Sequence, residues 1–273
     1  MTARRKYEDL KEIIAGHGPM LVAFSGGVDS TLLAVAAREV LGEQTRCVLL
    51  DSPAVPRAEV LQAQELAGDL GLALEVIGVP LLSDRRFIKN PADRCYHCKE
   101  IMAGYLKKRA AELGLACIAD GMNVSDTGEH RPGLRASSEA GILHPFISAG
   151  ITKQEIRDIA RDLNLPVWQK PSAACLASRI PYGERITPEK LRMIEGAEAF
   201  LGGLGIGQRR VRLHGNLARI EVHKEEREKI LEQQSVVVRH LRSLGFTYVT
   251  LDLEGYRSGS MDEVLFVTAR ERT

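Results

Sequence analysis

Ten residues near the N-terminus, Leu21 to Ser30, constrain the fold of this chain more than any other stretch. A short apolar run ends in the hexapeptide Ser-Gly-Gly-Val-Asp-Ser, and helical spacing of apolar residues begins directly after it. A buried strand would deliver the backbone to a turn. The glycines would let the turn approach a ligand without a Cβ in the way, and the next helix would point free N–H groups at that ligand. The stretch therefore predicts a strand, a phosphate-binding loop and a helix. No lysine follows the glycines, as the common P-loop would require.

Alternating apolar strands and helices follow this loop. Strands are predicted at 46–50, 72–79 and 115–119, and the helices between them show apolar residues three and four apart. This alternation is typical of βαβ units, so the expected fold class is α/β with a doubly wound parallel sheet. Ligands bind at the carboxyl ends of such strands. Ser52 and Gly121, which follow two of these strands, are therefore candidate ligand contacts, with ordinary turn chemistry as the alternative.

A smaller α+β domain is expected at the C-terminus, because a Thr187-Pro188 helix start is followed by a predicted α-β-β-α-β order ending near residue 253. We place the domain boundary so that residues 1–180 form the nucleotide-binding domain and residues 181–273 form the smaller one. Residues 170–183 are bounded by proline and glycine and predict a linker, and residues 124–150 predict irregular structure.

Charged residues on inward faces suggest a binding surface in the smaller domain. Glu198 lies on the apolar stripe of the first helix and needs a buried partner. The next strand offers Arg210 and Arg212 on one face. Guanidinium groups suit phosphate and carboxylate, so this face is either an anion site or a set of solvated ion pairs.

Three of the five cysteines are candidate ligands. Cys95 and Cys98 lie three residues apart at a predicted helix start, where both can face one ligand and where the helix end lowers a thiol pKa. This pair fits a redox site, half a zinc site or part of an iron–sulfur site. Zinc would need ligands from elsewhere, with Cys175, His97 and His144 as candidates.

The other cysteines differ in their surroundings. Cys175 lies among small residues with Arg179 nearby, which favours an accessible thiolate. Cys47 and Cys117 lie in apolar strands and are expected to be core residues.

Composition narrows the class of protein. The net charge of +1 over 273 residues does not favour a nucleic-acid partner. No apolar run reaches the roughly 20 residues of a membrane span, and the charged N-terminus does not resemble a signal peptide. We therefore expect a cytoplasmic protein with thiols rather than structural disulfides.

The hexapeptide resembles the loop of PP-loop ATP pyrophosphatases, and further motifs resemble one group of them, the LarE family of ATP-dependent sulfur transferases. The similarity covers about residues 10 to 262. The motifs that carry it are Asp120-Gly121-Met122-Asn123, Arg131-Pro132-Gly133-Leu134, Ser137-x-Glu139-Ala140-Gly141, Cys175 with Ser178-Arg179-x-Pro181-Tyr182-Gly183, Ala218-Arg219-Ile220-Glu221 and Thr250-Leu251-Asp252-Leu253.

The resemblance implies a reaction on pyridinium-3,5-dicarboxylic acid mononucleotide. ATP adenylates a carboxylate, sulfur displaces AMP, and a thiocarboxylate for the nickel-pincer cofactor results. ATP contacts are implied for Ser25, Gly26, Gly27, Asp29, Ser30, Ser52 and Gly121, with Mg²⁺ placed by Asp29. Catalytic roles are implied for Cys175, Asp29, Lys99, Glu198 and Arg179, and substrate contacts for Arg210, Arg212 and Glu221. A homo-oligomer is also implied, with a hexamer as one form.

Two sulfur sources occur in the family. Members with a single cysteine give up its sulfur, whereas others hold a [4Fe-4S] cluster on three cysteines. The presence of Cys95, Cys98 and Cys175 resembles the cluster type, and sacrifice of Cys175 is the alternative. The rival functions are a cluster-dependent PP-loop tRNA thiolase, a non-catalytic zinc or nucleotide binder, and a PP-loop amide ligase.

Overall fold

The chain folds into two compact units. Unit 1 comprises residues 1–81 and 93–173, and unit 2 comprises residues 82–92 and 174–273. The computed structural model describes residues 2–127, 132–171, 174–257, 259–261 and 263. The segment 82–92 thus groups with unit 2, which sequence reasoning did not anticipate. The roles assigned to the two predicted domains stay predictions.

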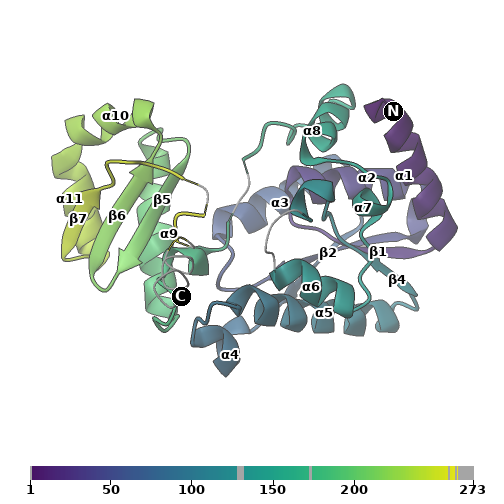
Figure 1. The fold of residues 1–273 in the computed structure, drawn as a ribbon, viewed down its shortest axis with the longest axis horizontal. Helices are drawn as coiled ribbons and strands as arrows, with labels where there is room; N and C mark the ends of the chain where they lie inside the picture. The colour runs from purple at the N-terminus through teal and green to yellow at the C-terminus, as the bar shows by residue number, and fades with distance from the viewer. Residues whose placement is uncertain (1, 128–131, 172–173, 258, 262, 264–273) are drawn as a thin grey trace, which may run out of the picture. The chain divides into compact units, whose positions relative to one another are not determined.

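Unit 1 is built on a parallel sheet of four strands (Figure 1). The strands are β1 (Met20–Ala23), β2 (Thr45–Asp51), β3 (Leu74–Gly78) and β4 (Cys117–Ala119). Their order is β3-β2-β1-β4, and every pair is parallel. The predicted α/β class with a parallel sheet is confirmed.

Helices cover both faces of this sheet. The larger helices are α1 (Ala3–His17), α2 (Val28–Leu41), α3 (Arg57–Asp69), α5 (Arg94–Glu112), α6 (Pro132–Glu139) and α8 (Lys153–Asp162), with a short α7 (Pro145–Ser148). The helices α5 and α6 lie along one side of the sheet, and α1, α2, α7 and α8 lie on the other (Figure 1).

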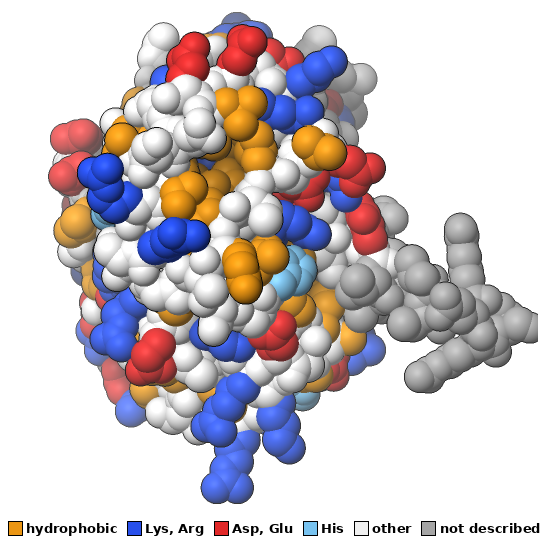
Figure 2. Space-filling model, turned by 90° about the vertical axis from the view of Figure 1, so that its left-hand side faces the viewer, with side chains coloured by type: hydrophobic (Ala, Val, Ile, Leu, Met, Phe, Trp, Pro, Cys, Tyr) orange, Lys and Arg blue, Asp and Glu red, His pale blue; other side chains and the backbone are white. Residues whose placement is uncertain are grey.

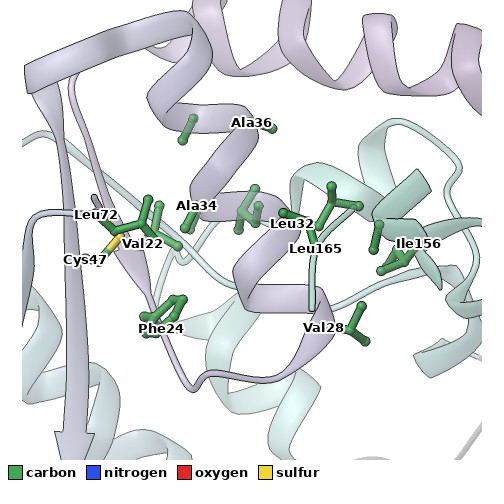
Figure 3. Close-up of a cluster of buried hydrophobic side chains, with 14 of the residues drawn as sticks. Val22, Phe24, Val28, Leu32, Ala34, Ala36, Cys47, Leu72, Ile156 and Leu165 are labelled. Atoms are coloured by element: carbon green, nitrogen blue, oxygen red, sulfur yellow. The ribbon is translucent and has the colours of Figure 1, made fainter. Parts of the chain in front are cut away.

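Strand side chains alternate between the two faces, as the pleat requires. Val22 and Cys47 pack with Leu32 in the larger core (Figure 3), whereas Leu21 and Val48 pack in a smaller core that includes residues of α5. Burial raises the pKa of the Cys47 thiol to about 12, which fits the predicted core role of this cysteine.

Residues 124–150 are more regular than their sequence suggested. The segment includes a 3₁₀ turn at Val124–Asp126 and the helices α6 and α7. Ala136 and Ser137 are buried, and α6 lies beside α5. Tertiary packing therefore overrides the weak helical pattern of this stretch. Glu129, His130 and Arg131 of the predicted charged loop lie outside the described residues.

Unit 2 has the predicted α-β-β-α-β order with one break. It contains α4 (Arg85–Ile88), α9 (Pro188–Gly203), β5 (Arg209–His214), β6 (Leu217–Val222), α10 (Arg227–Glu232), α11 (Gln234–Ser243) and β7 (Tyr248–Leu251). The strands β5 and β6 are antiparallel, and β6 and β7 are parallel. The second helix of the predicted order is divided into α10 and α11 at Gln233, whose ψ of 16° is not helical.

The stretch predicted as a linker is mostly packed structure. Leu176, Arg179 and Ile180 are buried, and a 3₁₀ turn spans Leu176–Arg179. The division between the two units falls inside the predicted linker, between residues 173 and 174, but residues 174–180 belong to unit 2, where Leu176, Arg179 and Ile180 are packed.

The surface of the molecule carries both apolar and charged groups. Figure 2 shows hydrophobic side chains grouped on one face, among lysine, arginine and acidic side chains. The exposed large hydrophobic residues of unit 2 are Leu231, Val236, Tyr248 and Leu253. Among the described residues, no helix is both long and apolar enough to span a membrane.

Candidate active site

The loop between β1 and α2 is held closed by two serines. Ser25 N donates to Ser30 Oγ at 3.1 Å, and the two hydroxyl oxygens are 3.0 Å apart. Ser30 Oγ also donates to the carbonyl oxygen of Gly27 at 3.2 Å. Gly27 is the N-cap of α2 and offers no side chain to the first-turn N–H groups, which leaves them for a ligand. The loop has the geometry of an anion cradle.

Two glycines allow other segments to pack against the loop. Gly26 has φ +69°, and a Cβ on it would lie 2.6 Å from Ala63 Cβ of α3. A Cβ on Gly121 would lie 2.9 Å from both Asp29 Cβ and Ser30 N. Any larger residue at either position would displace backbone, so these two glycines fix the distance between the loop, α3 and the end of β4.

A cavity of about 360 Å³ opens at the carboxyl ends of β1, β2 and β4. Its polar wall includes Ser25, Asp29, Ser30, Lys99 and Asp120, and its apolar wall includes residues of β2 and α5. The full lining is Ala23, Phe24, Ser25, Asp29, Ser30, Val48, Leu49, Leu50, Val55, Glu59, Cys98, Lys99, Met102, Ala103, Leu106, Asp120, Gly121, Met122, Ser137 and Ile142.

Most of the predicted nucleotide residues of unit 1 meet at this cavity. Ser25, Asp29, Ser30, Lys99 and Gly121 line it, and Gly26 and Gly27 form the loop beside it. Ser52 is not among the lining residues: it is 2% exposed, and its hydroxyl has no hydrogen-bond partner among the described residues.

Two lysines that sequence reasoning missed contact the loop. Lys153 Nζ pairs with Asp29 Oδ2, and Lys170 Nζ donates to the Gly26 carbonyl oxygen at 3.4 Å and pairs with Glu59 at 2.7 Å. Lys153 directly follows the Thr152 N-cap of α8, but no sequence spacing ties it to a loop more than a hundred residues earlier. These two ammonium groups add positive charge at the predicted phosphate site.

One carboxylate oxygen of Asp29 is available as a ligand for the predicted Mg²⁺ ion. Its Oδ1 atom is buried and has no hydrogen-bond partner in the described residues, whereas Oδ2 pairs with Lys153. A carboxylate oxygen of this kind is an appropriate ligand for a hard divalent cation.

Asp120, at the end of β4, is held by His144. His144 Nδ1 lies 2.7 Å from Asp120 Oδ1, and His144 Nε2 lies 3.0 Å from Ser138 Oγ. Burial raises the pKa of Asp120, but the hydrogen bond with His144 and the charge of Lys99 outweigh it, so the pKa lies below its usual range. Because both ring nitrogens of His144 are engaged, this residue is not a suitable zinc ligand as placed.

The three candidate cysteine ligands lie in different parts of the fold. Cys95 and Cys98 lie within the first five residues of α5, with Cys95 exposed and Cys98 lining the cavity. Cys175 is exposed and lies in unit 2. None of the five cysteines forms a disulfide, and no group of three or more His, Cys, Asp or Glu side chains in the described residues is placed to hold a metal ion. Three thiols of this kind are a chemically suitable donor set for iron–sulfur ligation.

A buried ion pair in unit 2 joins Arg179 and Glu198. Arg179 Nε and Nη2 donate to the two Glu198 carboxylate oxygens at 2.8 and 2.9 Å, and Val211 N donates to the same carboxylate at 2.9 Å. Of the partners considered for Glu198, the guanidinium that hydrogen-bonds to it belongs to Arg179, and β5 supplies a backbone amide, while Glu198 acts on Arg210 through its charge. Arg179 also donates to the carbonyl oxygen of Cys175 at 2.9 Å.

The arginines of β5 and β6 form a second group. Arg212 and Arg219 both bond to Glu221, which is fully buried, with Arg212 Nη2 at 2.9 Å and Arg219 Nη2 at 3.0 Å. Burial, together with the nearby charge of Arg179, lowers the pKa of Arg210, whose guanidinium lies 5.4 Å from the ring centre of Tyr256. The Arg212–Glu221 ion pair on this face is therefore buried rather than solvated, and an anion site on the face stays a prediction.

The parallel sheet, the Ser-Gly-Gly-Val-Asp-Ser loop at its carboxyl edge and the adjoining cavity define a nucleotide-binding protein of the PP-loop ATP pyrophosphatase class. A family model described as NAD synthase matches residues 8–124, and ATP use follows from membership of this class.

Relatives extend the similarity to almost the whole chain. An uncharacterised protein of Synechocystis sp. is 40% identical over 95% of this chain and 98% of its own length. The pyridinium-3,5-bisthiocarboxylic acid mononucleotide synthase of Lactiplantibacillus plantarum is 38% identical over 89% of each chain. An uncharacterised protein of Methanocaldococcus jannaschii is 34% identical over 88% of this chain and 91% of its own length. The chain belongs to the LarE family, the family of this synthase, and is an enzyme.

Proposed function

We propose that this enzyme adenylates the carboxylates of pyridinium-3,5-dicarboxylic acid mononucleotide and replaces AMP by sulfur. The observation that carries the proposal is the position of Cys98. Its side chain lines the same cavity as Asp29 and Ser30 of the phosphate loop, next to Lys99. A thiol ligand beside an adenylation site is what a sulfur transferase needs and an amide ligase does not.

The activation step follows from the charges around the loop. A substrate carboxylate oxygen attacks the α-phosphorus of ATP, the bond to the β-phosphate oxygen breaks, and pyrophosphate leaves. Asp29 would hold a Mg²⁺ ion, which would offset the charge of the phosphates. The α2 N-terminus, Ser25 and Ser30 would hold the phosphates, and Lys153 and Lys170 would offset the negative charge that develops on the leaving group. Lys99, which lines the same cavity, would stabilise the adenylate.

The transfer step uses the acyl-adenylate as an electrophile. A sulfur nucleophile forms a bond with the acyl carbon, the bond from that carbon to the AMP oxygen breaks, and the thiocarboxylate and AMP separate. We propose that Cys95, Cys98 and Cys175 hold the sulfur source. A [4Fe-4S] group on these thiols would supply bound sulfide.

Unit 2 would bind the substrate nucleotide. Arg210 and Arg212 lie on β5 with buried guanidinium groups, and Arg179 and Glu198 fix the backbone that carries Cys175. Because guanidinium groups bind phosphate in a forked geometry, we propose that this face of β5 binds the 5′-phosphate of the substrate.

Replacing Cys98 by serine is expected to remove bound iron and to lower thiocarboxylate formation at least a hundredfold, because a hydroxyl is a poor iron ligand. Pyrophosphate release in a single turnover should persist, since the phosphate loop is unchanged. The assay supplies ATP, Mg²⁺, sulfide and the dicarboxylate mononucleotide without oxygen, and product is measured by mass. Cys117→Ser is the matched control, since Cys117 Sγ contacts the His17 carbonyl oxygen and is not among the cavity residues.

Two outcomes would contradict parts of this proposal. If Cys98→Ser keeps full turnover while Cys175 loses its sulfur by mass, the sacrificial route operates. If the wild-type enzyme forms no pyrophosphate with this mononucleotide, the substrate assignment is wrong.

A further inference from the structure

A hydrogen-bonded chain of three side chains leads from the surface of unit 1 to the cavity. Ser138 is exposed on α6, His144 is the N-cap residue of α7, and Asp120 is 6% exposed at the end of β4. The two links measure 3.0 and 2.7 Å. The proposed reaction assigns no role to Ser138 or His144.

The geometry of this chain defines how the Asp120 carboxylate is held. Asp120 is ionised, so His144 Nδ1 donates to its Oδ1 atom, and Nε2 on the other side of the ring lies within hydrogen-bond distance of the Ser138 hydroxyl. Met122 N also donates to Asp120 Oδ1, at 3.1 Å. The carboxylate is thus fixed by two donors on one oxygen, while Oδ2 is buried and has no hydrogen-bond partner in the described residues.

Backbone hydrogen bonds between Leu143 and the end of β4 fix the position of His144. Asp120 N donates to the Leu143 carbonyl oxygen at 3.0 Å, and Leu143 N donates to the Ile118 carbonyl oxygen at 2.8 Å. Residue 143 therefore extends the sheet beside β4, and His144 follows it with little freedom to move away from Asp120.

Lys99 lines the same cavity as the Asp120 carboxylate. Both Lys99 and Asp120 line the cavity, and their charges attract each other. The stem of Lys99 lies close to α6, because a Cβ added to Gly133 would be 3.2 Å from Lys99 Cγ. The lysine stem thus runs beside α6, and its charged end is attracted by Asp120.

We propose that His144 is a positioning residue of this enzyme: by fixing the Asp120 carboxylate at the end of β4, it sets the Lys99 ammonium group in the cavity for adenylation. The adenylation part of this inference rests on the proposed function. His144 itself does not touch substrate, and the residue that acts on the reacting phosphate is Lys99.

Two substitutions of His144 distinguish the roles of its two ring nitrogens. His144→Asn keeps a donor near the position of Nδ1, whereas His144→Gln keeps a polar group near the position of Nε2 and loses the bond to Asp120. We expect His144→Gln to lower the kcat of pyrophosphate formation at least tenfold, with the Kd for ATP within twofold of wild type. His144→Asn should retain at least half of the wild-type kcat, and Ser138→Ala should stay within twofold.

A second measurement does not depend on the reaction. The rate at which an amine-acylating reagent modifies Lys99 is measured by mass in the holoenzyme and in each variant. We expect modification of Lys99 to be at least threefold faster in His144→Gln than in wild type and unchanged in His144→Asn. This readout also serves if His144→Gln melts too early for kinetics, because it can be taken at low temperature.

Equal losses of kcat in the Asn and Gln variants, or an unchanged rate of Lys99 modification in His144→Gln, would overturn the inference. Wild-type enzyme that forms no pyrophosphate would contradict the proposed function instead, and the Lys99 modification rates would still decide the role of His144.

Discussion

Replacing Gly26 by alanine is expected to lower the melting temperature by roughly 5 to 10 °C and to weaken ATP binding at least tenfold. Gly26 has φ +69°, and its added Cβ would lie 2.6 Å from Ala63 Cβ and 2.9 Å from Ala63 Cα. Backbone of α3 cannot move out of the way as a flexible side-chain end can. Overpacking and the unfavourable φ together cost about 2 to 4 kcal/mol, which corresponds to such a shift for a unit of this size.

The loss of ATP binding has the same cause as the loss of stability. Displacing residue 26 moves the amides and the two serines that form the phosphate cradle. Gly68→Ala is the matched control on the partner helix: Gly68 lies in α3, a Cβ on it would meet nothing within 4 Å, and alanine is a better helix former. Thermal melting and calorimetric titration with ATP test both effects. A Gly26→Ala protein that melts and binds ATP like wild type would show that the loop does not pack as described.

Replacing Arg179 by alanine is expected to destabilise unit 2 by about 3 to 5 kcal/mol, because it leaves a buried carboxylate without its cation. The side chains of Arg179 and Glu198 are 2% and 12% exposed. The same substitution removes the donor to the Cys175 carbonyl oxygen, so the loop that presents this thiol should lose its fixed position. Urea unfolding followed by circular dichroism measures the first effect, and the rate of Cys175 alkylation measures the second.

The first control for Arg179→Ala comes from α9, the helix that carries Glu198. Arg192→Ala breaks an ion pair with Glu189 that is about 70% exposed on each side, so its expected effect is below about 1 kcal/mol. The double variant Arg179→Met with Glu198→Gln removes both charges but keeps an acceptor for Val211 N, and it should recover much of the lost stability. If Arg179→Ala is no more destabilising than Arg192→Ala, the buried pair is not structurally important.

Local sequence patterns predicted the framework of unit 1 well. The strand, loop and helix at residues 20–41 follow from an apolar run, two glycines and helical spacing, all within about twenty residues. The Thr152 and Glu155 capping box and the Thr187-Pro188 helix start were also predictable, because a cap is a contact between residues three apart. The class of nucleotide site followed from the same short stretch.

Contacts between distant residues could not be predicted in this way. Lys153 lies 124 residues from its partner Asp29, and its own surroundings in the sequence contain no sign of that pairing. Glu198 was predicted to need a partner, but the sequence could not choose among several arginines, and its carboxylate is bound by Arg179, which lies 19 residues away. Ser52 was a reasonable ligand contact as a strand-end residue, yet its side chain is buried and does not line the cavity.

The grouping of residues 82–92 with unit 2 has a consequence for the order in which the protein folds during synthesis. Phe87 is completely buried, and the Asn90 side chain donates to the carbonyl oxygens of Ile180 and Pro181, which lie about ninety residues later. At roughly 5 to 20 residues per second, the ribosome takes about 5 to 20 seconds to add that length of chain. During this interval unit 1 gains its remaining sequence while Asn90 still lacks these two hydrogen-bond partners. The segment 82–92 is therefore where we expect a nascent chain of this enzyme to engage a chaperone.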